Sequence, residues 1–180
     1  MKEVINITLD LETLGRGDNA PIVQIGVLSF DDSGSAIDVF ERKVDLQSLD
    51  SEGVELSTVA WWLQQNSDVQ DNVFGGGFRV PIKDVLEQLE VFILEQVPDL
   101  RSEVRIWQHS SFDAPKVQHA FKKYLGREPE FKYWWWKDIR TLTTVTGVDK
   151  PIGTGLMLHD AVEDCRLQAE YISTCLNKLK

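Results

Sequence analysis

The stretch Ile5-Asn6-Ile7-Thr8-Leu9-Asp10-Leu11-Glu12-Thr13-Leu14 decides how the rest of the chain is interpreted. Its apolar side chains alternate from Ile5 to Leu9, which is typical of a β-strand with one face in a core. Because side chains two apart in a strand point the same way, Asp10 and Glu12 leave its end on one face. Two such carboxylates repel each other unless a cation lies between them, and oxygen ligands suit Mg²⁺ or Mn²⁺. The stretch predicts either a divalent-metal site or two solvated acids at a strand exit.

The spacing of the two acids is weak evidence by itself. Asp50-Ser51-Glu52 has the same spacing, but no apolar strand precedes it. The position of Asp10 and Glu12 directly after an apolar strand therefore carries the prediction.

Length and composition bound the class of protein. The chain has 180 residues, 42% of them hydrophobic and 27% charged, which predicts one soluble domain over residues 1–180. No apolar run reaches transmembrane length and no signal peptide precedes the first strand, so we expect no membrane partner and a cytoplasmic location. Cys165 and Cys175 fall in one expected helix, roughly 15 Å apart, too far for a disulfide. We interpret both as packing residues.

The net charge of −10 argues at first against a nucleic-acid partner. The charge is uneven, however, because residues 116–140 hold seven bases and three acids. This stretch is either a solvated face or a surface for phosphates. An acidic protein can also bind a polyanion when bound divalent metals reverse the sign of its site.

The remaining chain predicts an α/β fold. Strands at 21–30 and 36–44 would form an antiparallel meander of three strands with the first. Further elements are expected in this order: a helix at 58–65 with Ser57 as N-cap, a helix from Pro81 to Ile93, a strand at 104–107, a helix from Asp113, a strand near 131–135, a helix at 138–146 and a helix from about 160 to 179. This order predicts one mixed β-sheet with further parallel strands, flanked by α-helices.

Three more residues can join the acid pair. Asp113 stands where a helix begins, either as a simple N-cap or as a functional acid favoured by the helix dipole. His159 and Asp164 lie five apart at the start of the last helix, so both can reach one pocket, although His159 could also be a capping or core histidine. Two-metal phosphodiester hydrolysis needs such carboxylates for the ions and a base for the attacking water, a role that suits histidine near neutral pH.

At these residues the chain resembles the DEDDh 3′–5′ exonucleases. The motifs are Asp10-x-Glu12-Thr13, Phe112-Asp113-x-Pro115 and His159-x-Ala161-x-x-Asp164, in the family's order over residues 5 to about 172. The subtype of this family that has tyrosine in place of the histidine would have that tyrosine at position 160, where this chain has Asp160. The histidine subtype is therefore indicated. The resemblance implies an RNase H-like fold and two divalent ions, Mg²⁺ or Mn²⁺. It implies that Asp10, Glu12 and Asp164 hold one ion, that Asp10 and Asp113 serve the second, and that His159 is the general base.

Within the family the chain is most similar to small exoribonuclease-like proteins of bacteria and phages. The segments that carry this similarity are Glu12-Thr13-Leu14, Asn19 to Gly26, Thr58 to Leu63 and Asp138 to Leu142. The resemblance implies a 3′–5′ exonuclease that acts on single-stranded RNA or DNA with a free 3′ end, with RNA favoured. Homologues of this kind are often homodimers.

Four further residues are candidates for substrate binding. Thr13 and Leu14 directly follow the acid pair and could contact the terminal nucleotide. Trp62, in the pair Trp61-Trp62, could stack on an unpaired base, as could residues 134–136, or these tryptophans could pack in a core or dimer. Arg140 could bind a phosphate or pair with a core carboxylate.

Three other functions fit parts of the pattern. A DNA-proofreading exonuclease would use the same site. A catalytically silent nucleic-acid-binding module could share the fold, but it has no need for four acids that repel phosphate. A small-molecule phosphodiesterase would cleave a two-nucleotide substrate as well as it cleaves a ten-nucleotide one.

Overall fold

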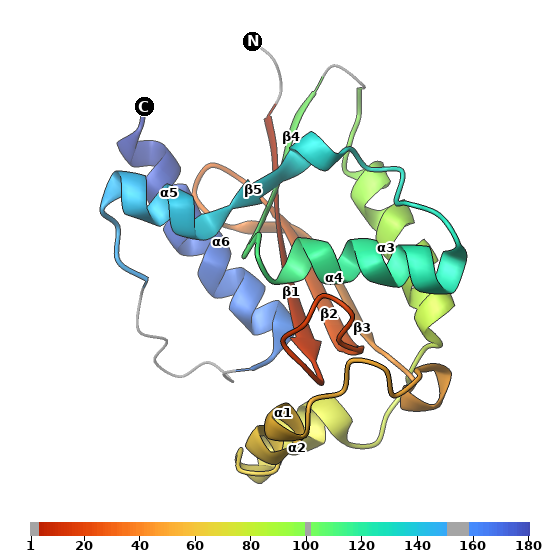
Figure 1. Ribbon diagram of the computed structural model, residues 1–180. Helices are drawn as coiled ribbons and strands as arrows, with labels where there is room; N and C mark the ends of the chain where they lie inside the picture. The colour runs from red at the N-terminus through yellow and green to blue at the C-terminus, as the bar shows by residue number, and fades with distance from the viewer. Residues whose placement is uncertain (1–3, 100–101, 151–158) are drawn as a thin grey trace.

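A computed structural model describes residues 4–99, 102–150 and 159–180. Within these residues one five-stranded sheet has the order β3-β2-β1-β4-β5 (Figure 1). The strands are β1 (Val4–Thr13), β2 (Ile22–Phe30), β3 (Ala36–Lys43), β4 (Glu103–Gln108) and β5 (Trp136–Asp138). The first three form an antiparallel meander, and β4 and β5 run parallel to β1. The predicted mixed sheet with flanking helices is confirmed.

The alternation in β1 divides its side chains between two layers. Ile7, Leu9 and Leu11 are buried in a core that α3 (Ile82–Glu95) and α4 (Asp113–Ala120) complete. The opposite face carries Thr8, Asp10 and Glu12. It faces α6 (Ala161–Lys178), whose Gln168 contacts Thr8 and Asp10. The apolar half of the strand thus anchors the polar half against one helix.

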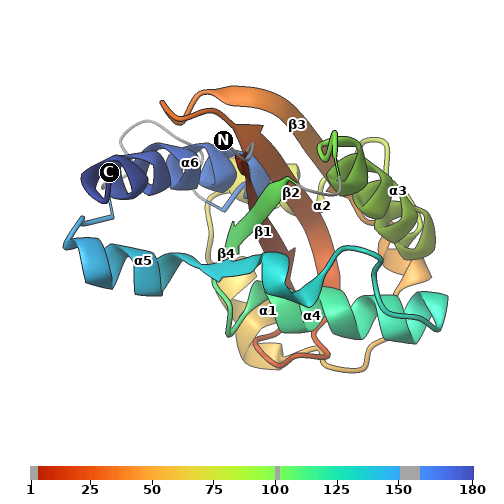
Figure 2. The ribbon, with the colours of Figure 1, turned by 90° about the horizontal axis from the view of Figure 1, so that it is seen from above.

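The second layer consists of α5 (Ile139–Thr146) and α6, on the side of the sheet away from α3 and α4 (Figure 2). The two helices bury Trp107 and the free Cys165 and Cys175, which confirms these cysteines as packing residues. α6 begins directly against β2. A Cβ at Gly26 would lie 2.4 Å from the backbone of Ala161, so only glycine permits this approach.

Two short helices, α1 (Leu56–Trp62) and α2 (Ser67–Phe74), lie beyond the C-terminal end of β1 (Figure 1). They bury Trp62 with Val23 of β2. The expected N-cap Ser57 is wrong, because the helix begins at Leu56, two residues before the expected Thr58, and its N-cap position is Glu55. The sequence reading missed α2, although its Asn66 cap accepts a hydrogen bond from Val69 N at 2.9 Å.

The expected strand near 131–135 is displaced along the chain. Tyr133–Trp135 forms a 3-10 turn, and the strand follows it, with Trp136 paired to Ile106. The Trp136 ring packs edge-on to Phe131 with centroids 5.5 Å apart. This contact places Trp136 as the first strand residue. Two further short elements are a 3-10 turn at Leu46–Ser48 and a π-helix at Phe121–Leu125.

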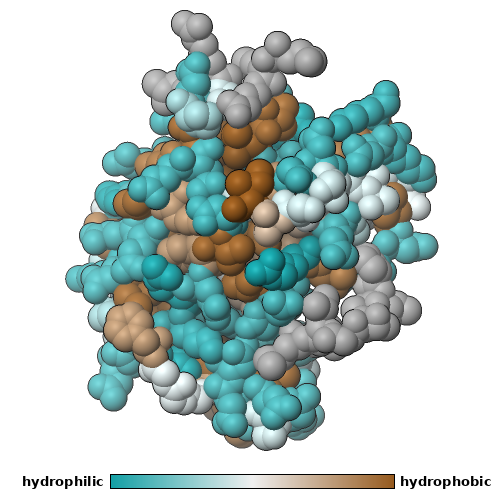
Figure 3. Space-filling model, turned by 180° about the vertical axis from the view of Figure 1, so that it is seen from behind, coloured by the Kyte–Doolittle hydropathy of each residue, from teal (hydrophilic) through white to brown (hydrophobic). Residues whose placement is uncertain are grey.

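The surface opposite the view of Figure 1 is mainly hydrophilic, with hydrophobic side chains gathered near its centre (Figure 3). No helix among the described residues is both long and apolar enough to cross a membrane. The homodimer stays a prediction.

Candidate active site

Asp10 and Glu12 lie near the end of β1, on the face that α6 covers. Glu12 is 8% exposed. The pairing of β1 with β2 shifts after Glu12, where Thr13 leaves the regular register. Both carboxylates are therefore held by a paired strand until the chain turns away from the sheet.

The start of α6 brings His159 and Asp164 to Glu12. One carboxylate oxygen each of Glu12 and Asp164 and one ring nitrogen of His159 lie within 4.8 Å of one another. His159 has a φ of 64°, the left-handed conformation, and Asp160 follows it as N-cap. The Asp160 carboxylate accepts hydrogen bonds from the backbone of Val162 and Glu163 at 3.0 and 2.9 Å. This turn and cap determine where His159 lies relative to the helix.

Asp113 reaches the same region from α4. It is the first residue of the helix and only 1% exposed, and its Oδ2 accepts a hydrogen bond from His109 N at 2.9 Å. Phe112 occupies the N-cap position, so Asp113 is not a simple N-cap. A backbone hydrogen bond with Leu11 connects Asp113 to β1, and the charge of Asp113 helps to raise the pKa of the neighbouring Asp10.

The second acid pair of the chain shows what is unusual about the first. Asp50 and Glu52 both bind Lys123, whose Nζ lies 2.7 Å from Asp50 and 2.9 Å from Glu52. The hydrogen bonds from Lys123 lower the pKa of both exposed acids. No ion pair among the described residues includes Asp10 or Glu12. Equal spacing thus gives a neutralised pair in one place and an uncompensated pair in the other.

The pKa values of the clustered acids are raised, as expected for carboxyl groups that have no cationic partner among the described residues. Burial, followed by the charges of Asp113, Glu12 and Asp164, raises the pKa of Asp10 well above its usual value. Burial raises the pKa of Glu12 to about 8, with the charge of Asp164 adding to it, and burial raises that of Asp113 to about 7. Hard divalent cations prefer such oxygen ligands, so the donor set fits Mg²⁺ or Mn²⁺.

A buried glutamine orients Asp10. Gln168 is 3% exposed, and its Nε2 donates to Asp10 Oδ1 at 2.8 Å. The hydroxyl of Thr8 donates to the Gln168 Oε1. Because Thr8 engages the carbonyl oxygen of the amide, the NH₂ group faces the carboxylate. One oxygen of Asp10 is thereby occupied, and the other is left for a cation.

His159 lies between the acids and the ring of Trp61. Burial lowers its pKa from the usual 6.5, so the imidazole is neutral at pH 7. The Trp61 ring meets it edge-on, with centroids 4.7 Å apart and an interplanar angle of 87°. Trp61 is 39% exposed, so part of its ring remains accessible beside the histidine.

Trp62, the tryptophan predicted to stack on a base, mainly packs. It is 3% exposed, its Nε1 donates to Thr13 O at 3.0 Å, and its ring meets Phe74 edge-on. Trp61 is better placed for stacking. Trp134 is 56% exposed at the 3-10 turn before β5, while Trp135 and Trp136 pack against the core. Adjacent tryptophans thus have different surroundings, as alternating side-chain directions require.

The acids open into a cavity of about 590 Å³. Thr13 and Trp62 line it, together with the predicted residues Asp10, Glu12, His159 and Asp164, whereas Asp113 does not. Trp61, of the tryptophan pair that the sequence offered for stacking, also lines it. Other lining residues were not predicted, namely Arg16, Ser57, Thr58, His109, Lys150 and Gln168. Among these, Arg16 carried a sequence signal, as a base in the loop directly after the acid pair.

Two predicted substrate contacts lie elsewhere. Leu14 packs against the cluster around Trp62 and lines a separate apolar pocket of about 180 Å³. The exposed Arg140 donates to Ser111 Oγ at 3.3 Å and does not line the acidic cavity. Of the two roles considered for Arg140, pairing with a core carboxylate is represented by no ion pair among the described residues, although its charge lowers the pKa of Asp113, and phosphate binding stays a prediction.

The mixed sheet flanked by helices is an RNase H-like fold, with the acid pair at the end of its central strand. Residues 5–176 match the model of the Rv2179c-like 3′–5′ exoribonuclease domain, and the chain belongs to this family. An exodeoxyribonuclease of enterobacteria phage T4 is 24% identical, over 90% of this chain and 85% of the phage protein. The resemblance inferred from the three motifs is confirmed.

Solved structures share the fold at low sequence identity. Exonuclease I of Methylocaldum szegediense has a TM-score of 0.64 at 12% identity, over 98% of this chain and 41% of that protein. Pop2p of S. pombe, in its Mg²⁺- and Mn²⁺-bound form, has a TM-score of 0.55 at 15% identity, over 94% of this chain and 81% of Pop2p. E. coli exonuclease I in complex with a dT13 oligonucleotide has a TM-score of 0.59 at 13% identity, over 98% and 41%. The chain spans about two fifths of the exonuclease I proteins.

Proposed function

We propose that this chain is a metal-dependent 3′–5′ exonuclease that removes nucleotides from the 3′ end of single-stranded nucleic acid. The observation that carries the proposal is the convergence of the buried Glu12 and the half-buried Asp164 with His159: ligand atoms of the three residues lie within 4.8 Å of one another. Such a cluster repels phosphate unless cations bind to it. Family membership supports exonuclease activity.

The four carboxylates would hold two divalent ions, Mg²⁺ or Mn²⁺. Asp10, Glu12 and Asp164 would hold one ion, and Asp10 with Asp113 would hold the second. Bound there, the ions supply Lewis-acid polarisation of the phosphate and stabilise the attacking and leaving oxygens. Gln168 leaves Asp10 one free oxygen, which suits a carboxylate shared between two ions.

His159 would act as general base. Its pKa lies below 6.5 because the ring is half-buried, so it is unprotonated at neutral pH and can accept a proton from water. The neighbouring Asp164 carboxylate favours the imidazolium that then forms. The edge of Trp61 restricts the ring on its other side.

The cavity fits an unpaired strand end. Its volume of about 590 Å³ is that of a small-ligand site, and the accessible part of Trp61 offers a stacking surface. The bases of a duplex are already stacked on each other, whereas an unpaired base is free to stack on Trp61. This surface therefore favours single strands. The family description favours RNA, whereas the phage relative is named for DNA. We propose RNA as the preferred substrate, with DNA as the competing one.

End-labelled strands test the proposal. A 5′-labelled single-stranded RNA and the DNA of equal sequence are each incubated with Mn²⁺ or Mg²⁺, beside the Asp10→Asn variant. The expected result is a ladder that shortens from the 3′ end, faster on RNA and absent in the variant. Asp50→Asn is the matched control and keeps the wild-type rate, because Asp50 binds Lys123 outside the cavity.

Retained binding without cleavage of either strand would contradict the proposal and favour the silent binding module. Faster cleavage of DNA would contradict the RNA preference alone. Equal cleavage of two- and ten-nucleotide strands would favour a small-molecule phosphodiesterase.

A further inference from the structure

Arg16 is a cation at the mouth of the acidic cavity that the proposed reaction leaves unused. It lies in the loop between β1 and β2, four residues after Glu12, and it lines the cavity. Its side chain is 80% exposed, whereas Glu12 is 8% and Asp113 1% exposed. Arg16 therefore lies at the rim, outside the deep region where the carboxylates meet.

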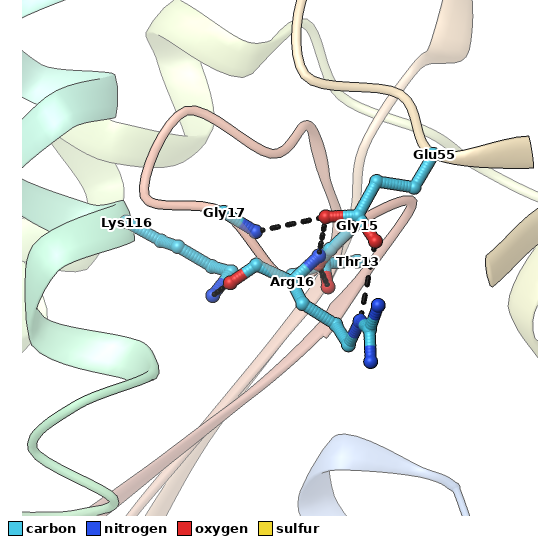
Figure 4. Close-up of polar contacts among 6 residues, drawn as sticks. All are labelled: Thr13, Gly15, Arg16, Gly17, Glu55 and Lys116. Carbon is cyan, nitrogen blue, oxygen red and sulfur yellow. Dashed lines mark hydrogen bonds and ion pairs between the residues drawn. The ribbon is translucent and has the colours of Figure 1, made fainter. Parts of the chain in front are cut away.

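Glu55 fixes Arg16 from the side of α1 (Figure 4). One oxygen of the Glu55 carboxylate accepts hydrogen bonds from the backbone of Arg16 at 2.8 Å and of Gly17 at 3.2 Å. The other oxygen lies 3.2 Å from the Arg16 Nε. A guanidinium has five donors, and this contact uses only Nε. Both Nη groups therefore remain without a partner among the described residues.

A buried lysine holds the same loop from the opposite side. Lys116 of α4 is 1% exposed, and its Nζ donates to Arg16 O at 3.0 Å and to Phe112 O at 3.1 Å. The Nζ also lies 3.4 Å from the centroid of the Phe112 ring. Figure 4 shows Glu55 and Lys116 approaching the loop from different sides. The backbone of Arg16 is thus bound at both its N–H and its C=O.

Close backbone packing adds to this rigidity. A Cβ at Gly15 would lie 2.4 Å from Gly53 O, and one at Gly53 would lie 2.3 Å from Asn19 O. Gly53 has a φ of 81°, which also favours glycine. The loop therefore lies directly on the turn before α1. The long, flexible side chain of Arg16 therefore extends from a backbone that these contacts hold rigid.

We propose that Arg16 binds the phosphate one nucleotide upstream of the scissile phosphate. This inference rests on the proposed exonuclease function. The scissile phosphate must lie at the carboxylates, deep in the cavity, so a rim cation meets the next phosphate as the strand leaves. Two parallel Nη donors match the oxygens of a phosphate, and the Glu55 contact orients them at a small cost in side-chain entropy.

Two dinucleotides that differ by one phosphate test this subsite. NpN contains only the scissile phosphate, and pNpN adds a 5′-phosphate at the upstream position. Both are made with the sugar that the wild-type protein cleaves faster. We expect the wild type to cleave pNpN with a kcat/KM about tenfold above that of NpN, mainly through KM, because a hydrogen bond to a charged group contributes on that order. Arg16→Gln should abolish this preference and leave NpN unchanged.

Two variants serve as controls. Arg105 of β4 is also paired with a glutamate, Glu103, at the end of the sheet away from the acids. Arg105→Gln should keep the pNpN preference. Lys150 lines the cavity, and its charge acts on His159, Asp164 and His109. Lys150→Gln should therefore also keep the preference.

The outcomes separate the two proposals. If the wild type cleaves no strand of any length, the exonuclease function fails and the subsite fails with it. If the wild type cleaves and Arg16→Gln keeps the preference, or slows NpN and pNpN equally, only the subsite is wrong. Loss of the preference in Lys150→Gln alone would assign the upstream phosphate to Lys150 and would also overturn the proposal. Equal thermal unfolding of the variants excludes a folding defect.

Discussion

Gln168 lies one helical turn after Asp164, and its amide reaches back to Asp10. Both contacts of α6 with the acids thus come from one face of the helix. The Thr8 hydroxyl fixes the orientation of that amide. Gln168 therefore acts as a positioning residue for Asp10 rather than as a ligand.

Replacing Gln168 by leucine keeps much of the side-chain volume and removes the hydrogen bond to Asp10. We expect the Mn²⁺ affinity and kcat to fall by about 10- to 100-fold, the usual cost of losing a residue that orients a metal ligand. Thr8→Val should cost less, because Gln168 still reaches Asp10. Calorimetric Mn²⁺ titration would measure the affinity, and wild-type affinity in Gln168→Leu would show that Asp10 needs no orienting partner.

The raised pKa values of the acids predict a pH-dependent stability of the metal-free protein. Glu12 has a pKa of about 8 in the folded chain against a usual 4.5, and Asp113 about 7 against 3.8. A carboxyl whose pKa is raised by folding stabilises the fold below its unfolded pKa, and this contribution is lost as the pH rises through the folded value. His109 and His159, whose pKa values are lowered from 6.5, act in the opposite direction only below that pH.

In the presence of EDTA we therefore expect the melting temperature to fall between about pH 6.5 and 8. Glu12→Gln should raise the melting temperature at pH 8 and flatten this slope, since it removes a buried charge. Asp50→Asn should leave the slope unchanged, because the pKa of Asp50 is lowered from 3.8. A melting temperature that stays constant or rises across this range would mean that Glu12 and Asp113 are not buried as carboxyl groups of raised pKa.

At the scale of elements, the cap of α6 joins three parts of the fold. Asp160 accepts hydrogen bonds from the first turn of α6, from Gln24 of β2 at 3.2 Å and from Asn72 of α2. Lys43 of β3 in turn donates to Asn72 at 2.8 Å. The start of the helix that carries His159 and Asp164 is thus connected to the sheet and to α2.

Asp160→Ala tests this connection. It should lower the free energy of unfolding by about 1–2 kcal/mol through the lost cap. It should also lower kcat, because the turn that contains His159 loses its anchor. Asn66→Ala removes the cap of α2 and serves as the matched control, with a similar loss of stability and an unchanged kcat. Denaturant unfolding and the end-labelled assay give the two quantities, and an unchanged kcat in both variants would restrict Asp160 to a structural role.

The elements differ in how far the sequence predicts them. The strand around Ile7 follows from its apolar alternation, and the strand around Val27 from its nearly continuous apolar run and the turn residues after it, because both patterns are local. The start of β5 depends on the packing of Trp136 against Phe131 and on pairing with Ile106, which are contacts between distant residues. A local pattern could not distinguish among three consecutive tryptophans.

The same reasoning applies to the candidate site. Asp10, Glu12, Asp113, His159 and Asp164 stand at the ends of elements, where spacing and order are visible in the sequence. Gln168 and Lys116 act through contacts with residues more than 90 positions away, so no spacing rule identifies them. Arg140 shows the converse, because its position in the segment Asp138 to Leu142, which carries the family similarity, did not bring it into the cavity.

At the scale of the molecule, three of the seven bases in the stretch 116–140 are engaged within the fold, whereas Lys122, Lys132 and Arg140 are exposed. Lys123 binds Asp50 and Glu52, Arg127 binds Glu90, and Lys116 is buried under the β1–β2 loop. These cations are used within the fold. With a net charge of −10, attraction of a polyanion depends on the bound metals and on the few cations of the rim.

The most direct test of the central claim is to count the Mn²⁺ ions bound by the wild type, Asp10→Asn and His159→Gln at pH 7.5. If the acids form the metal site and His159 is the base, the wild type binds two ions and Asp10→Asn loses at least one. His159→Gln should then keep both ions while its hydrolysis falls. Equal binding by the wild type and Asp10→Asn, or no binding by either, would show that this acid cluster is not a metal-dependent catalytic centre.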